Sequence, residues 1–158
     1  MMFEIMLRAW NKVKKRMEQV TGLRFNEAGY ISEILVADTS DWGKGCIDSV
    51  LDPKDVKLLH WSGMMDDNGV PIREKDIVEI SEYRNKGITF TEKDNERWTY
   101  RAVIEFENFE FVYYPHSSYS EPFKTLFENW SSDELDIKVI GNYYENPELL
   151  SEKIMEDQ

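Results

Sequence analysis

Residues 60–80, HWSGMMDDNGVPIREKDIVEI, have the pattern of short extended runs separated by two tight turns. Asn68-Gly69 is the strongest short-range hairpin signal, because both residue types accept a positive φ at little cost. Residues 73–76 predict a second, polar turn, and residues 77–80 are rich in the β-branched side chains that strands favour. This part of the chain is therefore predicted to consist of short strands and turns.

The acidic residues before Gly69 raise the alternative of a calcium-binding loop. An EF-hand loop places oxygen ligands at positions 1, 3 and 5, ahead of a glycine at position 6. Counting back from Gly69 puts Met64 at position 1, and its side chain offers no oxygen. The spacing therefore favours a hairpin turn over a calcium site.

Further motifs accompany this segment in a fixed order along the chain: RAW at residues 8–10, VIEFEN at 103–108, VIGN at 139–142 and YENPELL at 144–150. Together with residues 60–80 they resemble the YopX family, small proteins of temperate phages and prophages. The family more often has Tyr and Gly where this chain has Arg73 and Lys75, and a non-glycine residue is costly in a left-handed turn. The resemblance implies a β-rich fold and supplies no catalytic residues.

The composition supports one folded protein with a core. The chain has 158 residues, of which 41% are hydrophobic and 13% aromatic. We expect a mainly β fold with short helices. An N-terminal β-rich segment, residues 1–59, would pack on a small SH3-like β-barrel with short C-terminal helices, residues 60–158. A single domain spanning residues 1–158 is the alternative, and the SH3 comparison is an analogy from strand count and spacing.

The cysteine count and the apolar runs bound the compartment. Cys46 is the only cysteine, which excludes an internal disulfide and a four-ligand Cys/His zinc site. No stretch approaches the ~20 apolar residues of a membrane span, and no early apolar run follows a basic N-terminal region. We therefore expect a protein of the bacterial host cytoplasm that makes no membrane contact.

The net charge of −12 is unevenly distributed. Residues 1–60 carry nine acidic and nine basic groups, whereas residues 105–158 carry thirteen acidic groups against three basic ones. Such a surface repels the phosphate backbone, so direct nucleic-acid binding is disfavoured. The basic cluster Lys12, Lys14, Lys15 and Arg16 is the exception, and a solvated turn between two strands is favoured over a phosphate-binding patch.

The N-terminal part reads as a series of strands. Residues 3–10 alternate in polarity, residues 17–20 predict a returning strand, and Thr21-Gly22 predicts a break. Residues 30–35 fit either a helix or a strand, because so short a run has no decisive period. Asp52 and Pro53 predict the start of a short helix, as cap and first helical residue.

The C-terminal part contains the most regular strand pattern. Residues 97–106 alternate, Glu107-Asn108 predicts a reversal, and residues 109–114 predict the returning strand with Phe109, Phe111 and Tyr113 on one side. A terminal strand is expected at residues 137–143. Residues 122–130 have the spacing of an amphipathic helix, and a final helix is expected to begin at Asn146-Pro147 and to bury its leucines and Ile154.

One loop is the first candidate for partner binding. Residues 115–122, PHSSYSEP, are bounded by prolines and lie beside several tyrosines, which give amphipathic contact area at low entropic cost. The candidate partner-binding residues are Tyr113, Tyr114, His116 and Tyr119. An ordinary surface loop is the competing interpretation.

No recognisable catalytic apparatus or cofactor motif is present in the sequence. His60 and His116 have no ligand-spaced neighbours, and Cys46 is a lone thiol beside Lys44. We therefore favour a non-enzymatic phage accessory protein that needs no cofactor, acts through protein contacts with phage or host proteins, and forms a homo-oligomer. One alternative is an acidic decoy for a basic DNA-handling protein. The other is a hydrolase or nuclease that uses carboxylates and a divalent metal. Glu105, Glu107 and Glu110 could separately supply an acid–base pair, although they lie at strand and turn positions that normally point to water.

Overall fold

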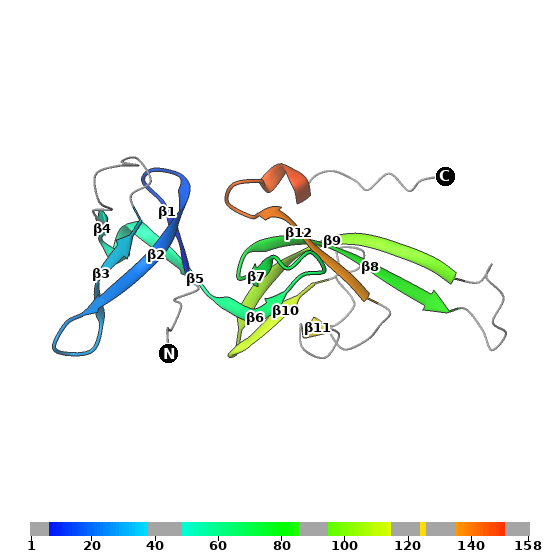
Figure 1. The fold of residues 1–158 in the computed structure, drawn as a ribbon, viewed down its shortest axis with the longest axis horizontal. Coiled ribbons are helices and arrows are strands. Elements are labelled where there is room, and N and C mark those ends of the chain that lie inside the picture. The colour runs from blue at the N-terminus through cyan, green and yellow to red at the C-terminus, as the bar shows by residue number, and fades with distance from the viewer. Residues whose placement is uncertain (1–6, 38–48, 86–94, 115–123, 126–134, 151–158) are drawn as a thin grey trace. The chain divides into compact units, whose positions relative to one another are not determined.

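The structure is a computed structural model, and it describes residues 7–37, 49–85, 95–114, 124–125 and 135–150. The chain divides into two compact units, Met1–Trp61 and Ser62–Gln158. The described residues form two five-stranded sheets and one two-stranded sheet, with two single turns of 3-10 helix (Figure 1). The expectation of a mainly β fold is therefore confirmed.

The first unit is one antiparallel sheet with the strand order β4-β3-β2-β1-β5. Its strands are β1 (Arg8–Asn11), β2 (Arg16–Phe25), β3 (Ile31–Val36), β4 (Ser49–Leu51) and β5 (Val56–Leu59). The core of this unit collects the apolar residues that alternate along these strands: Ala9, Val20, Ile34, Val36 and Val56.

Strand β2 corrects one prediction of the sequence analysis. The strand runs through Thr21 and Gly22 without ending, because its pairing with β3 shifts register between Val20 and Gly22 and then resumes. The glycine marks an irregularity of the bulge type, which interrupts the ladder locally and leaves the strand intact. Of the ambiguous residues 30–35, all but Tyr30 belong to strand β3, which begins at Ile31.

The predicted helix start at Asp52 is confirmed, although the helix is only the single 3-10 turn η1 (Pro53–Asp55). Asp52 Oδ1 accepts a hydrogen bond from Lys54 N at 3.0 Å, and this bond leads the causes that lower the pKa of Asp52. The chain is extended again at Val56, where β5 begins.

The second unit is a five-stranded antiparallel sheet with the order β11-β10-β9-β8-β12, accompanied by the two-stranded sheet β6-β7. The strands are β6 (Trp61–Met65), β7 (Pro71–Arg73), β8 (Asp76–Asn85), β9 (Asn95–Glu107), β10 (Glu110–Tyr113), β11 (Lys124–Thr125) and β12 (Leu135–Asn142). Within the described strands β11 and β12 are two open edges. The predicted SH3-like barrel is thus not confirmed.

The long β9 strand confirms the predicted strand at residues 97–106, and the hairpin after it is shifted by one residue. Asn108 and Phe109 form the turn, and β10 begins at Glu110. The prediction that Phe109 lies on the apolar side of the returning strand is therefore wrong. The pairing of Phe106 with Phe111, which brings their ring centroids to 4.7 Å, fixes this register.

The predicted helices near the C-terminus have different outcomes. Lys124–Thr125 form β11, paired with Val112 and Tyr113, so a helix is wrong for these two residues. The apolar residues of that predicted helix, Phe123, Leu126, Phe127 and Trp130, lie outside the described residues. The final helix is the 3-10 turn η2 (Pro147–Leu150), in which both leucines are half-buried, and Ile154 lies outside the described residues.

Candidate functional site

The turn between β6 and β7 is built around Asp66. Gly69 N donates to Asp66 O at 2.9 Å, and Asp66 Oδ1 accepts hydrogen bonds from Asn68 N and Val70 N, each at 2.8 Å. Of the two residues Asn68 and Gly69, only Gly69 has a positive φ, of 76°. The predicted hairpin is confirmed, and its turn has a single left-handed residue where the sequence pattern suggested two.

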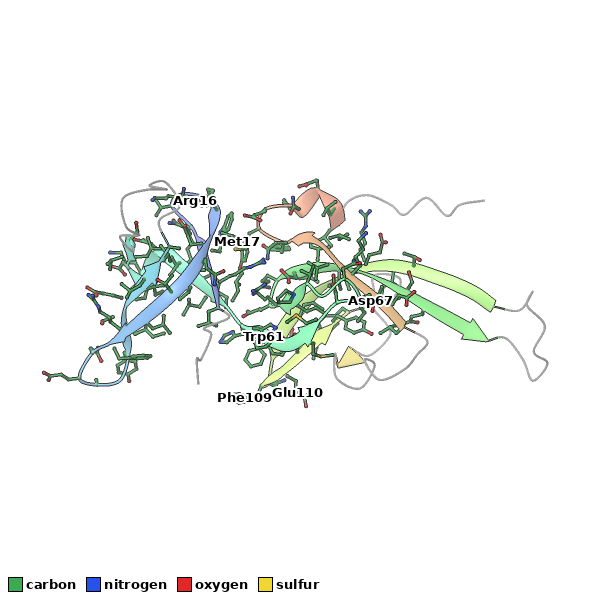
Figure 2. The ribbon with its side chains drawn as sticks, in the orientation of Figure 1. Arg16, Met17, Trp61, Asp67, Phe109 and Glu110 are labelled. Atoms are coloured by element: carbon green, nitrogen blue, oxygen red, sulfur yellow. The ribbon has the colours of Figure 1, made fainter. Side chains whose placement is uncertain are left out.

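Asp66 and the next residue, Asp67, also hold strand β12, which lies about seventy residues further along the chain. Val139 N donates to Asp66 Oδ2 at 2.9 Å, and Ile137 N donates to Asp67 Oδ2 at 2.8 Å. Asp67 N in turn donates to Ile137 O at 3.1 Å, and Figure 2 shows Asp67 beside β12. The carboxylates before Gly69 thus accept backbone N–H groups, which gives them a structural role.

The second turn keeps a left-handed residue although its residue is a lysine. Lys75 has a φ of 67°, and its Nζ lies 2.6 Å from both carboxylate oxygens of Glu105. The same ammonium is 5.5 Å from the ring centroid of Tyr143. Burial alone would lower the pKa of Lys75, but the hydrogen bond and charge of Glu105 outweigh burial and raise that pKa. The ion pair therefore accompanies the unusual backbone conformation.

Two tyrosines of the second unit pack together, the partly buried Tyr100 and the fully buried Tyr113. The Tyr100 hydroxyl donates to Glu82 Oε1 at 2.6 Å, and burial together with this bond raises the pKa of Tyr100 well above its ordinary value. Tyr113 is fully buried, and burial raises its pKa to about 12. Both phenols therefore stay protonated at neutral pH.

The candidate partner-binding residues do not form one surface in the described structure. Tyr113 is a core residue of strand β10, with none of its surface exposed. Tyr114 is exposed, and its hydroxyl donates to Glu107 Oε2 at 2.8 Å. His116 and Tyr119 lie outside the described residues.

The residues considered for chemistry are also dispersed. Cys46 lies outside the described residues, and His60 is an exposed residue just before β6. Glu105 pairs with Lys75, and Glu107 accepts the Tyr114 hydroxyl. Across the described part of the chain no group of three His, Cys, Asp or Glu side chains is arranged to hold a metal ion.

The exposed feature that sequence reasoning missed is the turn of the β9–β10 hairpin, Glu107 to Glu110, here called the acidic tip. Phe109 is 94% exposed, and Figure 2 shows Phe109 and Glu110 at the end of this hairpin. Asn108 and Phe109 have φ values of 51° and 66°, which defines a type I′ turn. Phenylalanine is a poor residue for such a conformation, since its side chain clashes there. The sequence signal that could have indicated this exposed turn is the aromatic residue that follows Glu107-Asn108.

The acidic tip also places like charges opposite each other. Glu107 and Glu110 are direct cross-strand partners, an arrangement that destabilises a sheet. Below them, the paired rings of Phe106 and Phe111 anchor the hairpin to the core. The tip is therefore a well-supported hairpin whose outermost residues are unfavourable for folding.

The first unit carries a turn of opposite charge between β1 and β2, Lys12 to Arg16, here called the basic turn. It confirms the predicted turn between two strands, and Val13 at its centre is 72% exposed. Asn11 Oδ1 accepts hydrogen bonds from the backbone of Val13 at 3.1 Å and Lys14 at 2.9 Å. Lys15 has a φ of 54°. All residues of the basic turn are exposed, and Arg16 at its end can be located in Figure 2.

These features define a class: a small protein of antiparallel sheets in two units, with an aromatic side chain displayed on a hairpin tip. Within the described residues no helix is long and apolar enough to cross a membrane. The family model described as YopX protein matches residues 6–151, and the chain therefore belongs to the YopX family.

A solved structure supports the same fold. The crystal structure of protein EF1440 from Enterococcus faecalis is similar to this chain, with a TM-score of 0.54 and 22% sequence identity. The match covers 91% of this chain and 96% of that one. No curated protein sequence matches the chain. At this identity the likeness concerns the fold alone.

Proposed function

We propose that this chain is a non-enzymatic phage accessory protein of the bacterial cytoplasm that acts through protein contacts and self-associates. The observation that carries the proposal is Phe109, a large apolar side chain that is 94% exposed on the acidic tip. Exposed apolar surface on soluble proteins often marks a site of interaction with another molecule, because such surface gains nothing from the fold itself.

Three properties of the acidic tip support a binding role. The left-handed φ of Phe109 costs folding free energy, its ring contributes no burial to the unit, and Glu107 repels Glu110. Local features that weaken a fold concentrate at functional positions. Burial of the Phe109 side chain by another molecule would contribute about 1.5–3 kcal/mol to binding.

The test is the oligomeric state of the purified full chain. Light scattering after gel filtration should give a mass above the 18.7 kDa of one chain. The substitution Phe109→Ser should raise the dissociation constant by roughly 10- to 100-fold, since about 1.4 kcal/mol corresponds to tenfold. Tyr30→Ser is the matched control, because Tyr30 is an aromatic residue that is 72% exposed with no positive φ. A monomeric wild type, or an assembly that survives Phe109→Ser, would contradict the proposal.

A second candidate function, the acidic decoy, is supported by the charge distribution. Residues 62–158 carry 22 acidic and 10 basic groups, whereas residues 1–61 carry nine of each, so the whole net charge of −12 belongs to the second unit. A decoy would bind a basic protein in a salt-sensitive manner that does not depend on Phe109. Binding of the Phe109→Ser variant to an immobilised basic DNA-binding protein at low salt separates the two functions.

A further inference from the structure

We propose that the acidic tip of one copy of this chain docks on the basic turn of a second copy. This inference rests on the proposed self-association and names the two surfaces that meet. The contact is heterologous, since it joins two different patches.

The charges of the two turns are complementary. The basic turn carries Lys12, Lys14, Lys15 and Arg16 with no acidic residue between them, and the acidic tip carries Glu107 and Glu110 with no basic residue between them. The Arg16 side chain is paired with Glu18 within strand β2, with its Nε 2.8 Å from Glu18 Oε1, so Lys12, Lys14 and Lys15 carry the positive charge that the basic turn presents. Like charges at the end of each hairpin repel. A contact between the two turns replaces both repulsions with attraction, which steers association and disfavours wrong partners.

The apolar groups are placed at matching positions. Phe109 lies between Glu107 and Glu110, and Val13 lies between the lysines of the basic turn, 72% exposed. Lysine side chains cover apolar surface with their aliphatic stems while the ammonium groups stay in water. The Phe109 ring can therefore pack against Val13 and the stems of Lys14 and Lys15, with an ammonium over its face in a cation–π arrangement.

The same charges argue against symmetric pairing of two acidic tips. Such a dimer would bring Glu107 and Glu110 of both copies together, and like charges across an interface are strongly unfavourable. Two basic turns would repel for the same reason. The backbone of both turns is also fixed by internal hydrogen bonds or ring packing, so each turn presents its side chains without folding on contact.

The experiment uses two variants of the full chain, each lacking one surface. Phe109→Ser removes the anchor of the acidic tip and keeps the basic turn. The double substitution Lys14→Glu and Lys15→Glu reverses the basic turn and keeps the tip. Both lysines are exposed residues of the turn between β1 and β2, so the variant should keep the circular dichroism spectrum of the wild type.

Each variant alone should be monomeric in sedimentation velocity at low salt. An equimolar mixture should form a 1:1 dimer and nothing larger, because only one intact tip and one intact turn remain in each pair. The dimer should weaken at least tenfold between about 50 mM and about 500 mM salt, since the exposed charges are screened. The control is Tyr30→Ser alone, which keeps both surfaces and should assemble as the wild type does.

The outcomes separate this inference from the proposed function. If Phe109→Ser dissociates the assembly and the lysine variant does not, Phe109 docks elsewhere and the inference is wrong while self-association stands. The inference is also wrong if the two variants are monomeric alone and remain monomeric when mixed. If Phe109→Ser leaves the assembly intact, the proposed function fails together with it.

Discussion

Replacing Phe109 with glycine should make the second unit more stable while it weakens self-association. The turn would then consist of an Asn-Gly pair, the preferred sequence for type I′, and glycine removes the steric cost of a left-handed residue, roughly 1–2 kcal/mol. Glycine also loses more backbone freedom on folding, which offsets about 0.5–1 kcal/mol of that gain. The lost side chain is 94% exposed, so almost no burial is lost with it.

The net expectation for Phe109→Gly is a free energy of unfolding higher by about 0.5–1 kcal/mol. Urea denaturation measures it, at a protein concentration where the wild type is monomeric, because assembly stabilises the folded state by mass action. Tyr30→Gly is the control of opposite sign: Tyr30 has no positive φ, so glycine there should destabilise the first unit. A loss of about 1 kcal/mol or more in Phe109→Gly would refute the reasoning, since it would mean that the ring is packed within the fold.

Three further changes test the turns at Asp66 and Lys75 and the core residue Tyr113. Asp66→Ala should lower the free energy of unfolding by on the order of 3 kcal/mol, because three backbone N–H groups lose their acceptor; an unchanged urea midpoint would contradict this. Lys75→Ala and Lys75→Gly both lose the ion pair with Glu105, but only glycine relieves the cost of the left-handed backbone. Urea denaturation should therefore show Lys75→Gly to be more stable than Lys75→Ala by about 1 kcal/mol. Equal stabilities would argue against strain at this residue. The pKa of Tyr113 is raised from 10.0 to about 12, so the folded state favours the protonated phenol. The resulting contribution to the free energy of unfolding is fully present below pH 10 and is lost as the pH rises through 12. Tyr113→Phe should therefore lose less stability than the wild type between pH 10 and pH 12 in urea titrations; parallel losses in both proteins would refute this assignment.

Local signals predicted the local structure. The turn before Gly69 and the cap at Asp52 depend on residues within a few positions, and both were predicted from those residues. The β9–β10 turn was misplaced by one residue, since phenylalanine favours a strand and the register depends on Phe106 meeting Phe111 across the hairpin. The intrinsic preferences of single residues do not predict the pairing of Phe106 with Phe111.

Contacts between residues far apart in the chain could not be predicted from the sequence pattern. The hydrogen bonds from β12 to Asp66 and Asp67 join residues about seventy positions apart, and no periodicity or motif spacing encodes them. Tyr113 was selected for its neighbourhood to a tyrosine-rich loop, but its place in β10 between paired strands puts it in the core. The acidic tip became visible only when the hairpin register and the exposure of Phe109 were known.

The position of Asp66 and Asp67 beside β12 has a consequence for how the protein behaves at high concentration. Among the described strands β12 lies at one edge of its sheet, and an edge strand with free N–H groups is a template for β-augmentation and for fibril growth. Ile137 and Val139 direct those groups to the two carboxylates, which accept the bonds that an incoming strand would need. The turn between β6 and β7 therefore protects this edge of β12 from pairing with a further strand.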